Sequence, residues 1–153
     1  MPREAEVLAF QIATRDFVDL AIRSVESVAP GVSLAQMRLM LALSDSGPTP
    51  SGSLARTLGV SPSSVTRMID RLERAGFVER GTSPQSRSVV TLSLTEAGAE
   101  TARRVLAWRY AEWQRLLAPL DPEDRRTASR VLTAVHEAVA DSSAESQTGG
   151  LPL

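Results

Sequence analysis

Two helical patterns separated by only three residues constrain the fold of this chain more than any other feature. The first covers residues 50–58, and a glycine at position 59 ends it. The second begins after Ser61, a favourable N-cap residue followed by proline at the first helical position. Its apolar residues recur at i, i+3, i+4 and i+7, as Val65, Met68, Ile69 and Leu72. A short helix, a tight turn and a longer amphipathic helix form a helix-turn-helix.

The periodicity changes from helical to alternating after Gly76, where the second helix is expected to end. The segments "FVER" (77–80) and "VVTLSL" (89–94) predict strands, because turn residues fill the intervening loop "GTSPQSRS". In the second strand, Val90, Leu92 and Leu94 share one face. A hairpin joined to a helix-turn-helix is a winged helix. The predicted fold class is therefore mainly α with a small β-hairpin wing.

Further helices are predicted on both sides of this unit. A long N-terminal helix over residues 3–29 carries more apolar surface than one small core needs. Thr49 is expected to cap the helix over 50–58, and Thr95 the first helix after the hairpin. The polar, glycine-containing segment 141–153 is predicted to be disordered. The remaining predicted helices cover residues 33–43, 95–117 and 121–139.

Composition narrows the function classes. The 153 residues suffice for one domain with a core, and the absence of cysteine excludes disulfides and thiolate chemistry. No stretch is apolar enough to span a membrane and the start shows no secretory signal, so a cytoplasmic location is expected. The net charge is −1, but residues 48–95 carry six arginines against three acidic residues. All 17 basic residues are arginine, whose planar guanidinium suits phosphates and guanine edges.

The side of the second helix opposite its apolar stripe is the candidate DNA-binding surface. Its N-terminal hydroxyl side chains permit close approach to bases in a major groove, and Arg67 is long enough to reach a guanine. Arg71 and Arg74 suit backbone phosphates, but solvated surface charges and salt bridges to Asp70 and Glu73 are equally open interpretations. Arg87 lies in the hairpin loop, where a basic tip suits a minor groove. The candidate residues are Ser61, Ser63, Ser64, Thr66, Arg67, Arg71, Arg74 and Arg87.

Residues 33–98 resemble the DNA-binding lobe of the MarR family of bacterial transcriptional regulators. The matching segments are "LARTLGVSPSSVTRMIDRLERAGFVER" and "LSLTEAG", and the order of the flanking helices also agrees. The resemblance implies one domain over residues 1–140, with dimerisation helices at 3–30 and 99–140. It also implies a homodimer that represses transcription from a near-palindromic site on double-stranded DNA, and release by a small aromatic or anionic ligand.

The chain departs from the family pattern in the wing. The family usually has Asp-x-Arg six residues before Leu-Thr, whereas this sequence has Ser86 and Ser88 there, with Arg87 between them. The ionic bracing of the wing is therefore questionable, although a basic residue is retained at the tip.

Two other function classes remain as alternatives. An enzyme needs a nucleophile with a base, facing carboxylates or a phosphate-binding glycine loop, and no such pattern is recognisable, so neither a catalytic group nor a cofactor is predicted. A winged helix can also act through protein or small-molecule binding without specific DNA recognition. DNA-binding regulation is the favoured function, with a shift assay on bulk genomic DNA as the test that separates it from the second alternative.

The remaining notable residues have ordinary explanations. Trp108, Tyr110 and Trp113 fit helix packing better than a ligand pocket. His136 is the single histidine, so no metal site is expected. The acidic cluster at residues 121–124 marks the start of a helix.

Overall fold

The computed structural model describes residues 1–83 and 86–148, with the side chains of 83–89 and 143–148 left out of the description. Its elements follow the order predicted from the sequence, apart from one additional short strand. The helices are α1 (Glu4–Val28), α2 (Leu34–Ser46), α3 (Ser51–Leu58), α4 (Pro62–Arg74), α5 (Glu96–Leu117) and α6 (Pro122–Thr148), and the strands are β1 (Thr49–Pro50), β2 (Val78–Ser83) and β3 (Ser86–Leu94). The mainly helical fold class with a small antiparallel sheet is confirmed.

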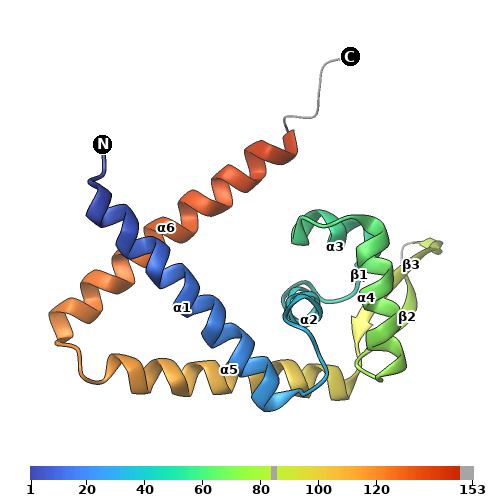
Figure 1. The fold of residues 1–153 in the computed structure, drawn as a ribbon. Helices are drawn as coiled ribbons and strands as arrows, with labels where there is room; N and C mark the ends of the chain where they lie inside the picture. Colours follow the sequence, from blue (N-terminus) through green and yellow to red (C-terminus); the bar gives the residue numbers. More distant parts are fainter. Residues whose placement is uncertain (84–85, 149–153) are drawn as a thin grey trace. The chain divides into compact units, whose positions relative to one another are not determined.

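The helix-turn-helix has the predicted turn, and only the start of its first helix differs from the prediction (Figure 1). Gly59 adopts a left-handed conformation with φ +65°, and the amide of Val60 donates to the carbonyl of Ala55 at 3.1 Å. The same arrangement ends α4, where Gly76 has φ +77° and the amide of Phe77 donates to the carbonyl of Leu72. Such C-terminal turns satisfy helix carbonyls that otherwise lack partners.

The hairpin is part of a three-stranded antiparallel sheet in the order β1-β3-β2. β1 was not predicted, and it pairs Thr49 with Leu92. The predicted N-cap role of Thr49 is wrong, because Pro50 occupies the N-cap position of α3 and makes no side-chain cap bond. The hydroxyl of Thr49 instead donates to the carbonyl of Gly47 at 2.9 Å.

The helix-turn-helix, the sheet and the helices packed around them share one hydrophobic core. The apolar stripe of α4 enters it, and so do residues of α1, α2, α3, α5 and the sheet. The predicted face of β3 divides along its length: Leu92 is 1% exposed, whereas Val90, nearer the hairpin tip, is 52% exposed. The core therefore covers the base of the wing and leaves its outer part in solvent. The core consists of Val25, Ala29, Met37, Leu39, Met40, Leu43, Leu54, Ala55, Val65, Ile69, Leu72, Val78, Leu92 and Val105.

The start of α5 is fixed against the turn that follows α4. The hydroxyl of Thr95 accepts a hydrogen bond from the amide of Gly98 at 3.1 Å, which confirms the predicted N-cap, and donates to the carbonyl of Gly76 at 2.6 Å. A Cβ at position 98 would collide with the carbonyl oxygen of Phe77. Glycine is required there because the backbones of α5 and the segment before β2 touch.

The described chain forms two units, residues 1–111 and 112–153, with the division inside α5. A single domain over residues 1–140 therefore remains a prediction. α6 continues to Thr148, so residues 141–148 are helical rather than disordered as predicted, and 149–153 lie outside the described residues. Within the described residues, no helix has the length and hydropathy needed to cross a membrane.

Candidate nucleic-acid interface

The N-terminal turn of α4 presents hydroxyl side chains at the surface. Ser61 caps the helix by accepting from the amide of Ser64 at 3.2 Å. Its hydroxyl also lies 3.1 Å from that of Ser63 and 2.9 Å from that of Ser64. Thr66 is exposed and donates to the carbonyl of Pro62 at 3.0 Å. The exposed N-terminus of α4 therefore combines the positive end of the helix dipole with hydroxyl groups that can donate or accept hydrogen bonds.

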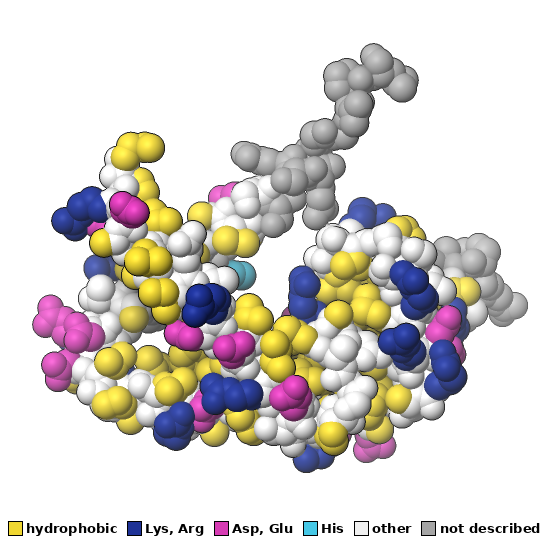
Figure 2. Space-filling model, viewed as in Figure 1, with side chains coloured by type: hydrophobic (Ala, Val, Ile, Leu, Met, Phe, Trp, Pro, Cys, Tyr) yellow, Lys and Arg dark blue, Asp and Glu magenta, His cyan; other side chains and the backbone are white. Residues whose placement is uncertain are grey.

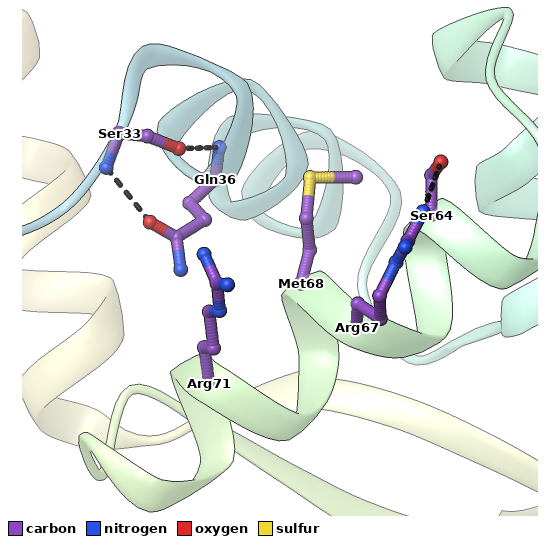
Figure 3. Close-up of a pocket in the computed structure, with 6 residues that line it drawn as sticks. All are labelled: Ser33, Gln36, Ser64, Arg67, Met68 and Arg71. Carbon is purple, nitrogen blue, oxygen red and sulfur yellow. Dashed lines mark hydrogen bonds between the residues drawn. The ribbon is translucent and has the colours of Figure 1, made fainter.

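The flank of α4 that faces α2 is basic (Figure 3). A cavity of about 290 Å³ is lined by side chains of both helices. Arg71 extends across it toward Gln36, whereas Arg67 lies along α4 with its guanidinium 3.5 Å from the hydroxyl of Ser64. The side chain of Arg71 makes no hydrogen bond or ion pair with any described residue. The cavity is lined by Ser33, Gln36, Ser64, Arg67, Met68 and Arg71.

The opposite flank of α4 is acidic and faces β2. Asp70 and Glu73 both bind Arg80, through Nη2 to Oδ1 at 2.6 Å and Nε to Oε2 at 3.0 Å. The salt bridges considered from the sequence for Arg71 and Arg74 are therefore absent among the described residues. Arg74 instead donates from Nε to the backbone carbonyl of Asp70 at 2.9 Å.

Arg80 was not singled out from the sequence, although a signal was present. Side chains alternate along a strand, so Arg80 shares the face of Val78, which is buried in the core. A strand residue on the helix-facing side, two positions beyond a buried valine, is well placed to meet acidic residues of α4.

Within the wing, the structure describes side chains only near the base. β2 and β3 pair from Val78 with Leu94 to Ser83 with Ser86, and the register shifts between Thr82 and Ser83. The side chain of Arg87 lies outside the described residues, as do those of Ser86 and Ser88. The role of Arg87 and the effect of the missing Asp-x-Arg pair therefore remain predictions.

Charged and apolar side chains are distributed differently over the surface (Figure 2). Arginine side chains gather over the lobe that contains α3 and α4, whereas hydrophobic side chains lie at the surface along α1. Six large apolar side chains within residues 7–18 of α1 are each at least 40% exposed. They are Val7, Leu8, Phe10, Ile12, Phe17 and Val18.

A second pocket, of about 300 Å³, lies away from α4, among α1, α2 and α5. Arg109 enters it half-buried and donates from Nε to the hydroxyl of Ser24 at 2.9 Å. Burial lowers the pKa of Arg109, and no carboxylate among the described residues pairs with it. No sequence pattern predicted this site. Its lining residues are Thr14, Phe17, Val18, Ala21, Leu34, Arg38 and Arg109.

The aromatic residues and the histidine considered from the sequence lie elsewhere. Trp108, Tyr110 and Trp113 are not among the residues that line this pocket. His136 is exposed on α6, and the described residues contain no cluster of potential metal ligands.

Comparison with known proteins agrees with this geometry. Residues 32–90 match the model of the MarR family. The HTH-type transcriptional repressor MdtR of Bacillus subtilis is 33% identical over 108 residues, which are 71% of this chain and 70% of that protein. The crystal structure of RV1404 from Mycobacterium tuberculosis is 32% identical, covers 92% of this chain and 97% of its own, and superposes with a TM-score of 0.82.

The same fold occurs in a protein solved with nucleic acid. Streptococcus pneumoniae FabT in complex with DNA is 21% identical, covers 90% of this chain and 99% of its own, and has a TM-score of 0.76. At that identity the likeness concerns the fold. Together, the family match, the similarity to MdtR and the recognition-helix geometry show that the chain belongs to the MarR family of transcriptional regulators.

Proposed function

We propose that the chain represses transcription as a homodimer that binds a near-palindromic operator in double-stranded DNA. The observation that supports this function best is the exposed N-terminal half of α4. It combines surface hydroxyl groups, a helix N-terminus and Arg67, while the opposite side of the helix is buried in the core. A helix held in this way fits a major groove with its first turns toward the bases.

The side chains of α4 divide into two roles in this proposal. Ser63, Ser64, Thr66 and Arg67 approach base edges, and Ser61 presents the helix N-terminus to a phosphate. Arg71 and Arg74 lie further along the helix and contact the phosphate backbone. Arg87 contacts the minor groove or its phosphates from the wing.

Exposed apolar surface supports the homodimer. Large apolar side chains remain accessible on α1, and α6 exposes Val131, Leu132, Val135 and Val139. Soluble monomers rarely leave such stripes uncovered, and a two-fold axis covers the same stripe on both copies. Two recognition helices related by that axis read half-sites about one helical turn, or roughly 10 base pairs, apart.

The test compares Arg67→Ala with Arg87→Ala on the operator and on single-base variants of it at two salt concentrations. Arg67→Ala is expected to weaken operator binding by about 1–3 kcal/mol and to relax discrimination at one base position. Arg87→Ala is expected to weaken binding to all sequences alike and to reduce the salt slope by about one. If Arg67→Ala binds every sequence as the parent does, α4 does not read DNA.

The pocket containing Arg109 supports release of DNA by a small aromatic anion. Phe17, Val18 and Leu34 supply apolar walls, and the guanidinium groups of Arg38 and Arg109 supply positive charge. A half-buried arginine that lacks an acidic partner favours a ligand carboxylate, because the ion pair replaces part of its lost hydration.

Benzoate is a suitable probe for this pocket, with benzyl alcohol as its uncharged analogue. Calorimetry is expected to show binding of benzoate to the parent but not to Arg109→Met, and binding to persist in Arg104→Met, whose arginine is exposed on the same helix. Equal binding of benzoate to all three proteins would exclude this pocket as the site.

A further inference from the structure

A carboxylate near the DNA-facing surface of a recognition helix is an electrostatic problem. Asp70 lies close to the row of Ser63, Arg67 and Arg74, opposite the buried stripe, and Glu73 lies beside it on the flank facing β2. When α4 occupies a major groove, both carboxylates lie within about a Debye length, roughly 8 Å, of phosphates. Left uncompensated, they would repel the DNA backbone and oppose the neighbouring arginines.

Arg80 meets both carboxylates. Its Nη2 lies 2.6 Å from Oδ1 of Asp70 and its Nε 3.0 Å from Oε2 of Glu73, so one guanidinium bridges successive turns of α4 from the adjacent strand. The backbone of Arg80 is held in register opposite Leu92, which is buried in the core. The backbone that carries this guanidinium is therefore fixed by the sheet and the core.

We infer that Arg80 acts in DNA binding through Asp70 and Glu73, by neutralising them, rather than by touching DNA itself. Two of the three guanidinium nitrogens of Arg80, Nε and Nη2, already bind carboxylates. The side chain of Arg71, by contrast, has no partner among the described residues and is available for a phosphate. The inference rests on the proposed function and adds to it a residue that prepares the charge of the interface.

Stability is not the main role of this three-residue cluster. All three side chains are between 42% and 45% exposed, and ion pairs at that exposure contribute little to the free energy of unfolding. The same charges matter more to a polyanion, because every unpaired carboxylate at the interface acts on several phosphates at once.

The experiment measures the dissociation constants of four proteins for the operator and for an unrelated duplex of equal length. They are the parent, Arg80→Ala, the triple variant Arg80→Ala/Asp70→Asn/Glu73→Gln, and Asp70→Asn/Glu73→Gln. Arg80→Ala is expected to weaken binding about tenfold on both duplexes, because two bare carboxylates face the backbone. The triple variant is expected to bind within about threefold of the parent, since the repelling charges leave together with their partner.

A direct contact gives a different pattern. If Arg80 itself binds a phosphate, the triple variant stays as weak as Arg80→Ala, and this result overturns the inference. Parent-like binding by Arg80→Ala overturns it as well. Asp70→Asn/Glu73→Gln keeps Arg80 and is expected to bind as tightly as the parent or up to about threefold more tightly. A loss of affinity in that variant contradicts the inference even if Arg80→Ala fails to fold.

The matched control is Arg103→Ala, which removes an exposed arginine paired with Glu100 on α5. It is expected to leave both dissociation constants unchanged. Failure of the proposed function is seen separately, because the parent would then bind neither duplex.

Discussion

The winged lobe and the C-terminal helix α6 differ in how far they bury their apolar side chains. The lobe encloses its core within one chain: Met37, Leu39, Met40 and Val65 are all completely buried. In α6, by contrast, none of the side chains described over residues 122–142 is buried. The exposed apolar side chains of α6 are Val131, Leu132, Val135 and Val139. Such a stripe is stabilised only when a second surface covers it. The core of the lobe is therefore complete within one chain, whereas the exposed apolar side chains of α6 fit the homodimer proposed above.

The largest expected effect comes from placing a charge in the apolar stripe of α6. Leu132→Glu is expected to raise the dissociation constant of the dimer about ten-thousandfold, or about 5.6 kcal/mol, because the two-fold axis buries the carboxylate twice. Light scattering at low micromolar concentration measures the change. Thr133→Glu, on the opposite side of α6, introduces the same charge and is expected to leave the dimer intact. Dimers of unchanged stability in Leu132→Glu would place the interface elsewhere.

A smaller effect is expected from opening a cavity in the lobe. Leu72 is 1% exposed, and Leu72→Ala is expected to lower the free energy of unfolding by about 3 kcal/mol. The loss is expected to be similar at low and high protein concentration, because the cavity lies within one chain. Thermal unfolding at two concentrations checks both points. Val90→Ala, at an exposed position in the same sheet, is expected to change stability by less than about 0.5 kcal/mol.

The smallest of the three effects concerns the junction between the lobe and α5. Gly98→Ala is expected to cost about 2 kcal/mol, because the added methyl group forces the backbone of Phe77 to move. In Gly81→Ala the new methyl group would lie 3.6 Å from the hydroxyl of Thr91, which is an ordinary contact, and stability is expected to stay near that of the parent. Denaturant unfolding of the two variants measures the difference. Equal midpoints would show that α5 adjusts at no cost.

The sequence predicted the features that depend on neighbouring residues. Ser61 with Pro62, Gly59 and Gly76 mark helix ends through local backbone preferences, and each boundary agrees with the structure. The apolar stripe of α4 was predictable for the same reason, because its period is set within one helix.

Features that depend on distant residues were missed or misjudged. β1 has two residues, one of them proline, and it is a strand only because it pairs with β3. The partner of Asp70 and Glu73 was sought within α4, whereas Arg80 reaches them across the fold. The pocket at Arg109 needs α1, α2 and α5 together. The helical extension to Thr148 was missed because the polar composition of that segment was taken as a sign of disorder.

The pairing of β1 with β3 has a consequence for which part of the wing can be exchanged. The base of the wing is anchored from both sides, by β1 at Leu92 and by β2 along its length, and its inward side chains belong to the core. Val90, nearer the hairpin tip, lies outside this core and is exposed. Loop tips in this situation accept insertions and exchanges. Tips grafted from other regulators would then offer a way to change the overall affinity for DNA without redesigning the helix that reads its sequence.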